Sequence, residues 1–257
     1  MKGNMGLIVR TELYKICKRK DTWLFFAVLL VPALYAIGLS VGSDIITYSG
    51  DGNITAMNFA VTMFQMSQSM FIFGAILAII AARTLGTEIE DKSLLLYLNR
   101  VGDRRRIYRG KLYALTVYNL VADILLMGSS FLFYYFVLIR RKDIAAGILW
   151  DANGVLEFVQ ICAVCLFWIM TILIMVMLST KFKPVVCLGI YMIGYVIMNL
   201  LSYARVIGYV SPLFYLGKFT NADTLVIKEI IIYILYFVII SLGINYLGKR
   251  RMEKKDL

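Results

Sequence analysis

Residues 83–111 read RTLGTEIEDKSLLLYLNRVGDRRRIYRGK, a charged segment that separates two long apolar stretches. Thr87 followed by Glu90 matches a capping box, so we predict that a short helix begins at Thr87. Asn99 and Gly102 supply its stop, and its more apolar side carries Ile89, Leu94, Leu95 and Leu98. A basic cluster leads into the next apolar stretch and consists of Arg104, Arg105, Arg106, Arg109 and Lys111. The segment is therefore predicted to be a short amphipathic helix between two membrane spans, on the side where positive charge collects.

The composition is that of an integral membrane protein. Of the 257 residues, 61% are hydrophobic, and the mean hydropathy is +0.79, whereas soluble domains are nearer ~45–50% apolar. The net charge of +11 is explained by basic loops that flank apolar spans, so we predict a lipid bilayer and no nucleic acid as partner. The chain has no histidine, the commonest general base and metal ligand.

We predict an all-α fold in which residues 1–21 form a basic amphipathic helix along the membrane surface, without a cleaved signal peptide. Six membrane spans follow, at residues 23–41, 57–82, 112–139, 155–178, 185–203 and 225–247. Pro32 is predicted to kink the first span, and the composition of residues 203–224 favours short interfacial or re-entrant helices. With both termini on one side, 21 of the 27 Lys and Arg residues lie on that side and six on the other, which satisfies the positive-inside rule.

Two spans each carry a polar stripe at helical spacing. The stripe on the second span consists of Asn58, Thr62, Gln65 and Ser69. The stripe on the fifth span consists of Tyr191, Tyr195, Asn199 and Ser202. A polar face inside a span must meet protein or water, so these residues either make hydrogen bonds between helices or line a transport path.

The third span holds Asn119 and Asp123 one helical turn apart. A carboxylate at this depth is costly unless it is protonated or paired. We favour a structural hydrogen bond or a subunit contact over a proton relay, because no basic partner is visible at similar depth.

The sequence predicts neither an enzyme nor a bound cofactor or metal. A phosphate-binding loop needs Gly-Lys followed by Ser or Thr, and the Gly-Lys pairs that end at Lys111, Lys218 and Lys249 all lack it. Cys162 and Cys165 form a C-x-x-C without a second pair or a histidine, so we interpret them as packing residues.

The order of these features resembles the permease subunits of type-2 ABC exporters over nearly the whole chain. The matching segments are the lead RTELYKICKRKDTW at residues 10–23, then Glu88-x-x-x-Lys92-Ser93-Leu94-Leu95-Leu96, Arg100, the arginines 104–106 and Gly110-Lys111. In that family a proline usually falls where this chain has NRVGD, at residues 99–103.

The resemblance implies that residues 1–21 are a connecting helix and that Glu88 to Arg100 form a coupling helix. The residues expected to couple to a separate ATP-binding subunit are Glu88, Glu90, Lys92, Leu94, Leu95 and Arg100. The working unit would contain two such subunits, which bind ATP and Mg, and a second copy of this chain or a sister permease. The second and fifth spans would line the path, and residues 203–224 would cap it on the outside.

The resemblance also implies a multi-pass location in a bacterial cytoplasmic membrane, with both termini cytosolic. The expected substrate is hydrophobic or amphipathic, for example an antimicrobial peptide or bacteriocin in export or immunity, or a drug. Two alternatives stay open. One is a secondary transporter driven by an ion gradient through Asp123, and the other is a membrane anchor or sensor that does not transport.

Overall fold

The computed structural model describes residues 5–42, 53–204, 207–220 and 226–254, apart from the side chain of Arg100. The described chain is helical, with one isolated backbone bridge between Ile54 and Ala145. Six of its helical segments are long and apolar enough to cross a membrane. They are Lys20–Val41, Ile72–Glu90, Arg104–Arg140, Gly154–Ser179, Pro184–Ser202 and Ile227–Glu253.

The first predicted span is a broken helix. It consists of η1 (Lys20–Trp23), α2 (Leu24–Leu29) and α3 (Val31–Val41), with the break at Leu30. Pro32 lies in the first turn of α3, where its missing N–H costs no helical hydrogen bond. The predicted kink is therefore confirmed, and the proline acts by beginning a new helix.

The prediction of one continuous span over residues 57–82 is wrong. The chain forms α4 (Ala56–Ser69) and α5 (Ile72–Glu90), separated by Met70 and by Phe71, whose φ of +46° is left-handed. A left-handed non-glycine residue inside a helix interrupts its hydrogen-bond ladder. The polar stripe therefore belongs to α4, and the membrane-length helix begins after it.

The predicted helix start at Thr87 is also wrong. The Thr87 hydroxyl donates a 2.6 Å hydrogen bond to the Arg83 carbonyl inside α5, so it caps nothing. The short helix is α6 (Ser93–Val101), which begins after Lys92 in a left-handed conformation. The predicted stop is confirmed, because α6 ends at Gly102 with a φ of +70°.

The basic cluster belongs to the next helix rather than to a loop before it. α7 (Arg104–Phe136) begins where the Asp103 side chain accepts a hydrogen bond from the Arg105 backbone N–H. The helical turn η2 (Leu138–Arg140) follows it. The third span therefore begins about two turns before residue 112.

The remaining elements agree with their predicted positions to within a few residues, except at the C-terminal end. They are α8 (Gly154–Ser179), α9 (Pro184–Ser202), η3 (Gly208–Val210), α10 (Pro212–Thr220) and α11 (Ile227–Glu253). α11 extends six residues beyond residue 247 and carries the basic tail as helix. Short helices occur within residues 203–224 as predicted, although residues 205–206 and 221–224 lie outside the described chain.

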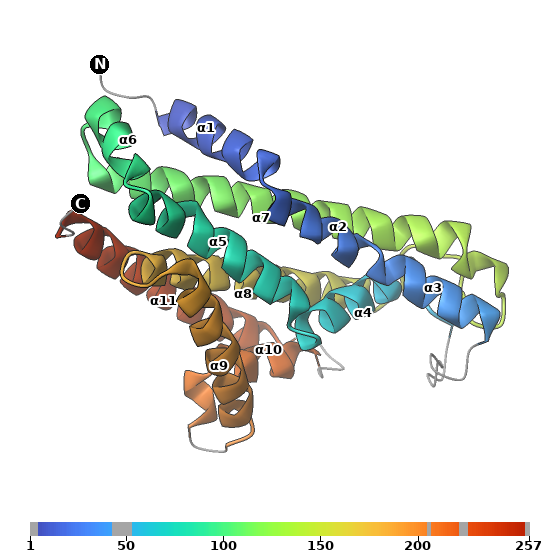
Figure 1. The fold of residues 1–257 in the computed structure, drawn as a ribbon. Coiled ribbons are helices and arrows are strands. Elements are labelled where there is room, and N and C mark those ends of the chain that lie inside the picture. The colour runs from blue at the N-terminus through green and yellow to red at the C-terminus, as the bar shows by residue number, and fades with distance from the viewer. Residues whose placement is uncertain (1–4, 43–52, 205–206, 221–225, 255–257) are drawn as a thin grey trace.

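α5, α7 and α8 form the centre of the bundle, and α1 (Met5–Lys18) lies against α7 (Figure 1). α9 diverges from the bundle axis, and α9 and α11 leave most of their apolar side chains exposed. The predicted apolar side of α1 faces the protein, because Ile8 and Ile16 are buried and Val9 and Leu13 pack on the core. The placement of α1 on a membrane surface remains a prediction.

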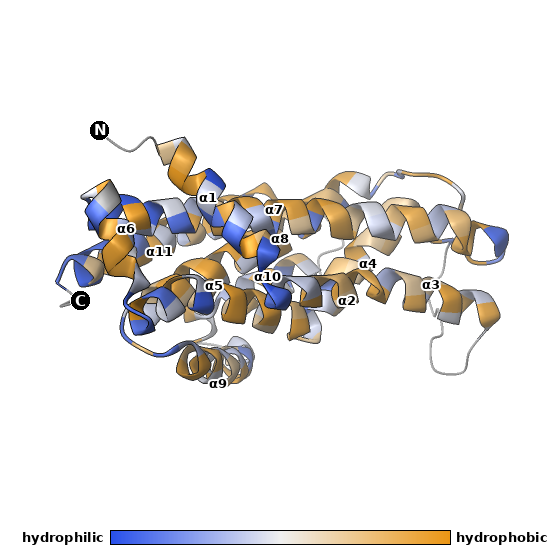
Figure 2. Ribbon diagram, turned by 45° about the horizontal axis from the view of Figure 1, so that its top comes forward, coloured by the Kyte–Doolittle hydropathy of each residue, from blue (hydrophilic) through white to orange (hydrophobic). Residues whose placement is uncertain are grey.

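Hydrophilic residues gather at the end of the bundle that carries α6 and the C-terminal turns of α11 (Figure 2). The basic group at residues 140–142 lies at the opposite end and includes Arg141. The Arg141 guanidinium donates to the Ser40 carbonyl of α3 at 3.0 Å and pairs with Asp143 at 2.8 Å. Its hydrogen bond holds the pKa of Asp143 below its usual range. Arg141 therefore caps the C-terminal end of α3, which gives this basic group a structural role.

Candidate functional site

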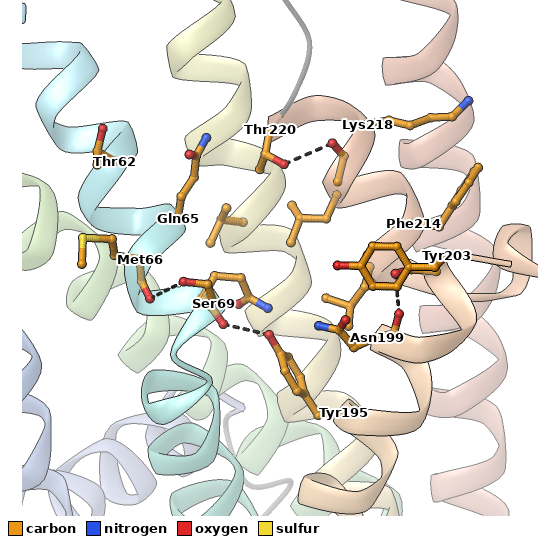
Figure 3. Close-up of a pocket in the computed structure, with 16 residues that line it drawn as sticks. Thr62, Gln65, Met66, Ser69, Tyr195, Asn199, Tyr203, Phe214, Lys218 and Thr220 are labelled. Carbon is orange, nitrogen blue, oxygen red and sulfur yellow. Dashed lines mark hydrogen bonds between the residues drawn. The ribbon is translucent and has the colours of Figure 1, made fainter. Parts of the chain in front are cut away.

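An open cavity of about 820 Å³ lies between α4, α8, α9 and α10 (Figure 3). Most of its lining is polar or aromatic, with a few aliphatic side chains from α8 and α10. The lining residues are Thr62, Gln65, Met66, Gln68, Ser69, Val164, Tyr195, Asn199, Ser202, Tyr203, Leu213, Phe214, Leu216, Gly217, Lys218 and Thr220.

The cavity brings the two predicted polar stripes together. Thr62, Gln65 and Ser69 approach it from α4. Tyr195, Asn199 and Ser202 approach it from α9, more than 120 residues later in the chain. Six of the eight residues predicted to line a path therefore share one cavity.

The break between α4 and α5 lies where the two stripes meet. The Tyr195 hydroxyl donates a 3.0 Å hydrogen bond to the Gln68 carbonyl, and the Tyr195 and Phe71 rings lie 5.9 Å apart. The last carbonyls of a helix need hydrogen-bond donors from elsewhere, and Tyr195 of α9 donates to one of them, the Gln68 carbonyl. The hydrogen bond and the ring contact therefore hold α9 against the end of α4.

The hydroxyl groups of the cavity direct their hydrogens to the backbone. Thr62, Ser69 and Ser202 each donate to a carbonyl three or four residues earlier in their own helix, as does Thr220. Their oxygens are left as acceptors toward the cavity. Gln68 adds a donor, because its Nε2 is buried and has no hydrogen-bond partner among the described residues.

Lys218 is the charged residue of the lining, and it forms a 3.3 Å ion pair with Glu229 of α11. The described residues that line the cavity include no carboxylate. Gln68 and Lys218 were not predicted individually as cavity residues, although the resemblance implied that residues 203–224, which include α10, cap the path. A helical stripe indicates one face of one helix, so the spacing alone does not show which residues of α10 line the cavity.

Asn58 and Tyr191 do not line the cavity. The Asn58 amide donates to Glu157 of α8 at 2.8 Å, a hydrogen bond between helices. Tyr191 is buried with its hydroxyl against Gly74 of α5. For these two residues the structure supports the packing interpretation.

A charge cluster of Glu12, Lys15, Glu88 and Lys111 joins α1, α5 and α7. The Lys111 Nζ lies 2.7 Å from Glu12 Oε2, 2.8 Å from Glu88 Oε2 and 2.9 Å from the Thr84 carbonyl oxygen, and its side chain is 0% exposed. Lys15 Nζ bridges the same two carboxylates at 3.0 and 2.9 Å. Two positive and two negative charges therefore balance in one buried network.

Lys15 is the half-buried member of this charge cluster. Burial lowers the pKa of Lys15, but its hydrogen bond to Glu88 and the charges of Glu12 and Glu88 outweigh that effect and raise the pKa above its ordinary value. Lys15 therefore stays protonated while the carboxylates are charged.

α6 is attached to this charge cluster through Tyr97. The Tyr97 hydroxyl lies 3.1 Å from the Thr11 hydroxyl of α1, and the Lys15 ammonium lies 4.6 Å from the centre of the Tyr97 ring. Leu94 is fully buried, whereas Leu95 is 36% and Leu96 71% exposed. One side of α6 is thus anchored to the bundle, and the other presents leucine to the outside.

The residues predicted to couple to an ATP-binding subunit lie in three places, namely the end of α5, the turn before α6, and α6 itself. Glu88 lies near the end of α5 in the charge cluster, so it is not on α6. Glu90 is exposed as the last residue of α5, and Lys92 lies in the turn before α6. Leu94 and Leu95 lie on α6, as does Arg100, whose side chain is outside the described part of the structure.

Asn119 and Asp123 are both buried in α7. The Asn119 amide donates to Asp123 Oδ2 at 2.8 Å, so the hydrogen bond favoured from the sequence is present. Asn119 Oδ1 and Asp123 Oδ1 have no hydrogen-bond partner among the described residues. No group of three metal-ligating side chains occurs in the described ranges, and all four cysteines are free.

The fold and these sites define a multi-pass, all-helical membrane protein with a polar cavity between its helices. No protein-family model matches the chain, and no curated protein sequence matches it significantly.

Proposed function

We propose that this chain is the membrane-spanning subunit of an ABC exporter. In this proposal two copies of a separate ATP-binding subunit carry ATP and Mg, and a second copy of the chain or a sister permease completes the transporter. The chain lies in the cytoplasmic membrane of a bacterium, with both termini and α6 in the cytosol. The substrate is hydrophobic or amphipathic, such as an antimicrobial peptide or a drug.

The observation that carries the proposal is the attachment of α6. Leu96, and to a lesser degree Leu95, are exposed at the hydrophilic end of the bundle (Figure 2), where lipid would not cover them. Exposed leucine in such a place indicates a surface that binds another protein. The same helix is joined through Tyr97 to the charge cluster, and from there to α1, α5 and α7.

This geometry suits the transmission of force. A short helix that is anchored by the buried Leu94 and by the contacts of Tyr97 would move as a rigid body with the helices that hold it. Movement of a docked ATPase at α6 would reach α5, and α5 follows directly from α4, which carries one stripe of the cavity. The cavity would then serve as part of the translocation path, with access changed by the movement of α4 and α5 against α9.

Co-purification from native membranes tests the proposal. We expect a tagged wild-type chain to bring an ATP-binding subunit with it, and a Leu96→Glu variant to lose at least 90% of that subunit. Leu149→Glu is the matched control, because Leu149 is 47% exposed near the opposite end of the bundle. A well-folded wild-type chain that brings no ATPase would contradict the proposal.

The buried pair of Asn119 and Asp123 favours a second candidate, a transporter driven by an ion gradient. Asp123→Asn removes the titratable group but keeps an oxygen that accepts from Asn119. If Asp123→Asn abolished transport while Leu96→Glu left it unchanged, the second candidate would replace the first. For the exporter we expect Leu96→Glu to abolish transport and Asp123→Asn to leave it unchanged.

A further inference from the structure

A second cavity, of about 510 Å³, lies where the turn between α8 and α9 meets the C-terminal end of α11. We call it the basic pocket, and it is lined by Thr180, Lys181, Leu247, Arg250, Arg251 and Lys254. It is separate from the polar cavity, with which it shares no lining residue. The C-terminal end of α11, which supplies most of its lining, lies at the hydrophilic end of the bundle (Figure 2).

Two segments that are distant in sequence bring four positive side chains around this pocket. Lys181 comes from the α8–α9 turn, and Arg250, Arg251 and Lys254 come from the last turns of α11. The spacing of Arg250 and Lys254 places them on one face of that helix. The gathering of these four cations around one pocket therefore depends on how the α8–α9 turn packs near α11, as well as on the basic residues at the end of the chain.

The charge of the basic pocket is not balanced by the part of the chain that the structure describes. Among the described residues, no carboxylate lines the pocket and none of its four cations forms an ion pair. The nearby Glu253 on the same helix instead pairs with Arg105 of α7. Like charges around one hollow repel one another, and a bound anion would relieve that repulsion.

The surroundings of the pocket favour an anion that carries an apolar chain. Leu247 belongs to the lining, and the turns of α11 that precede it expose Ile239, Leu242 and Tyr246 by 64–68% each. On the other side of the pocket, Val185 at the start of α9 is 75% exposed. A basic mouth that continues into exposed apolar helix is the arrangement by which proteins hold anionic lipid headgroups.

We propose that the basic pocket binds the phosphate-bearing headgroup of an anionic lipid, with the acyl chains against the exposed apolar face of α11. Lys181 and Arg250 approach the phosphate from the two segments and so hold the α8–α9 turn to the end of α11. The lipid neutralises the pocket and fixes the position of α11, which has few buried residues of its own. This site does not depend on the exporter proposal.

Titration of the purified full chain with phosphatidylglycerol, followed by native mass spectrometry, tests this site. The test variant is Lys181→Gln with Arg250→Gln, and the matched control is Arg140→Gln with Lys142→Gln, two exposed cations at the opposite end. Near a membrane each basic residue is worth about fivefold in affinity for anionic lipid, so we expect the test variant, which lacks two, to bind roughly 25-fold more weakly. The control should bind as the wild type does, and phosphatidylcholine should bind weakly to all three.

A parallel titration in 10 mM inorganic phosphate separates a lipid from a soluble anion. Persistence of bound phosphatidylglycerol supports the proposal, whereas its displacement would assign the pocket to free phosphate and overturn the lipid site. Equal binding by the wild type and the test variant would also overturn it. Loss of a co-purifying protein from the test variant, with unchanged lipid binding, would instead make the pocket a protein contact. The single variant Lys181→Gln, on an exposed turn, repeats the test with the least risk to folding.

Discussion

The charge cluster joins α1, α5 and α7, whereas the polar cavity lies between α4, α8, α9 and α10, and both place polar groups inside a largely apolar protein. In the charge cluster, Lys111 is completely buried, and every ionic contact is 2.7–3.0 Å long. In the cavity the groups are hydroxyls and amides around about 820 Å³ of open space. The first arrangement suits a rigid joint, because the buried Lys111 is held by carboxylates from two other helices. The second suits a surface that rearranges around a bound substrate.

The difference follows from the cost of removing each group from water. A buried charge is stable only when its partners are fixed around it, so the charge cluster holds α1, α5 and α7 in one relative position. A hydroxyl that donates to its own helix is already partly satisfied, so the cavity keeps its polar groups without filling the space. Predictions about stability therefore concern mainly the charge cluster, and predictions about selectivity concern the cavity.

Lys111→Met should have the largest effect. It leaves the two carboxylates of Glu12 and Glu88 with the half-exposed Lys15 as their one remaining shared cation, and breaking a buried ion pair costs about 3–5 kcal/mol. Thermal unfolding of the detergent-solubilised protein measures the loss. The triple variant Glu12→Gln, Glu88→Gln, Lys111→Met removes the unpaired charges and should recover much of it. A single variant as stable as the wild type would show that the charge cluster does not hold the helices together.

Gly74→Ala should have the second-largest effect on stability. A Cβ at Gly74 would collide with the Tyr191 hydroxyl, so α5 and α9 would be forced apart, and overpacking of this kind costs about 1–3 kcal/mol. Tyr191→Phe in the same chain should relieve the collision. Gly189→Ala is the control on α9, because nothing lies within 4 Å of that Cβ. Unfolding temperatures that are equal for Gly74→Ala and Gly189→Ala would argue against this contact.

Tyr195→Phe should reduce stability less than Gly74→Ala does, but it should clearly reduce transport. It removes the hydrogen bond to the Gln68 carbonyl, which is worth about 1 kcal/mol. Because that bond joins α9 to the break between α4 and α5, export should fall several-fold while the protein stays folded. Vesicle transport assays measure export. Tyr113→Phe, at an exposed position, is the control. Unchanged export would remove Tyr195 from the proposed path.

The smallest effect is the pH dependence that Lys15 confers. Its pKa is higher in the folded protein than its ordinary value of 10.5, so its contribution is complete below that value and is lost as the pH rises through the folded pKa. Unfolding temperatures of the wild type and of Lys15→Met should therefore differ by a constant amount from pH 7 to 9 and converge as the pH rises beyond 10.5 and through the higher folded pKa. A difference that disappears on acidification instead would contradict this assignment.

Sequence periodicity placed most of the long apolar helices well, because each depends on local spacing and hydropathy, but it joined α4 and α5 into one span. The prediction of helix ends failed where a local stop or start signal lies inside a helix that continues through it. Thr87 and Glu90 match a capping box, yet α5 continues past Thr87 because Thr84, Leu85 and Gly86 are packed against other helices. The break at Phe71 carried no proline or glycine signal, and Tyr195 contacts it from α9, far away in the sequence.

The sequence by itself determined that this chain has six long apolar helices, a strong bias of positive charge and two polar stripes. Each of these features arises from residues close together in the chain, whose spacing decides the face on which they lie. Only the tertiary structure decided that both stripes share one cavity, that Lys111 meets Glu12 across 99 residues, and that Lys181 lies beside Arg250. Those pairings depend on how whole helices pack, and helical periodicity carries no information about which helix a given face will meet.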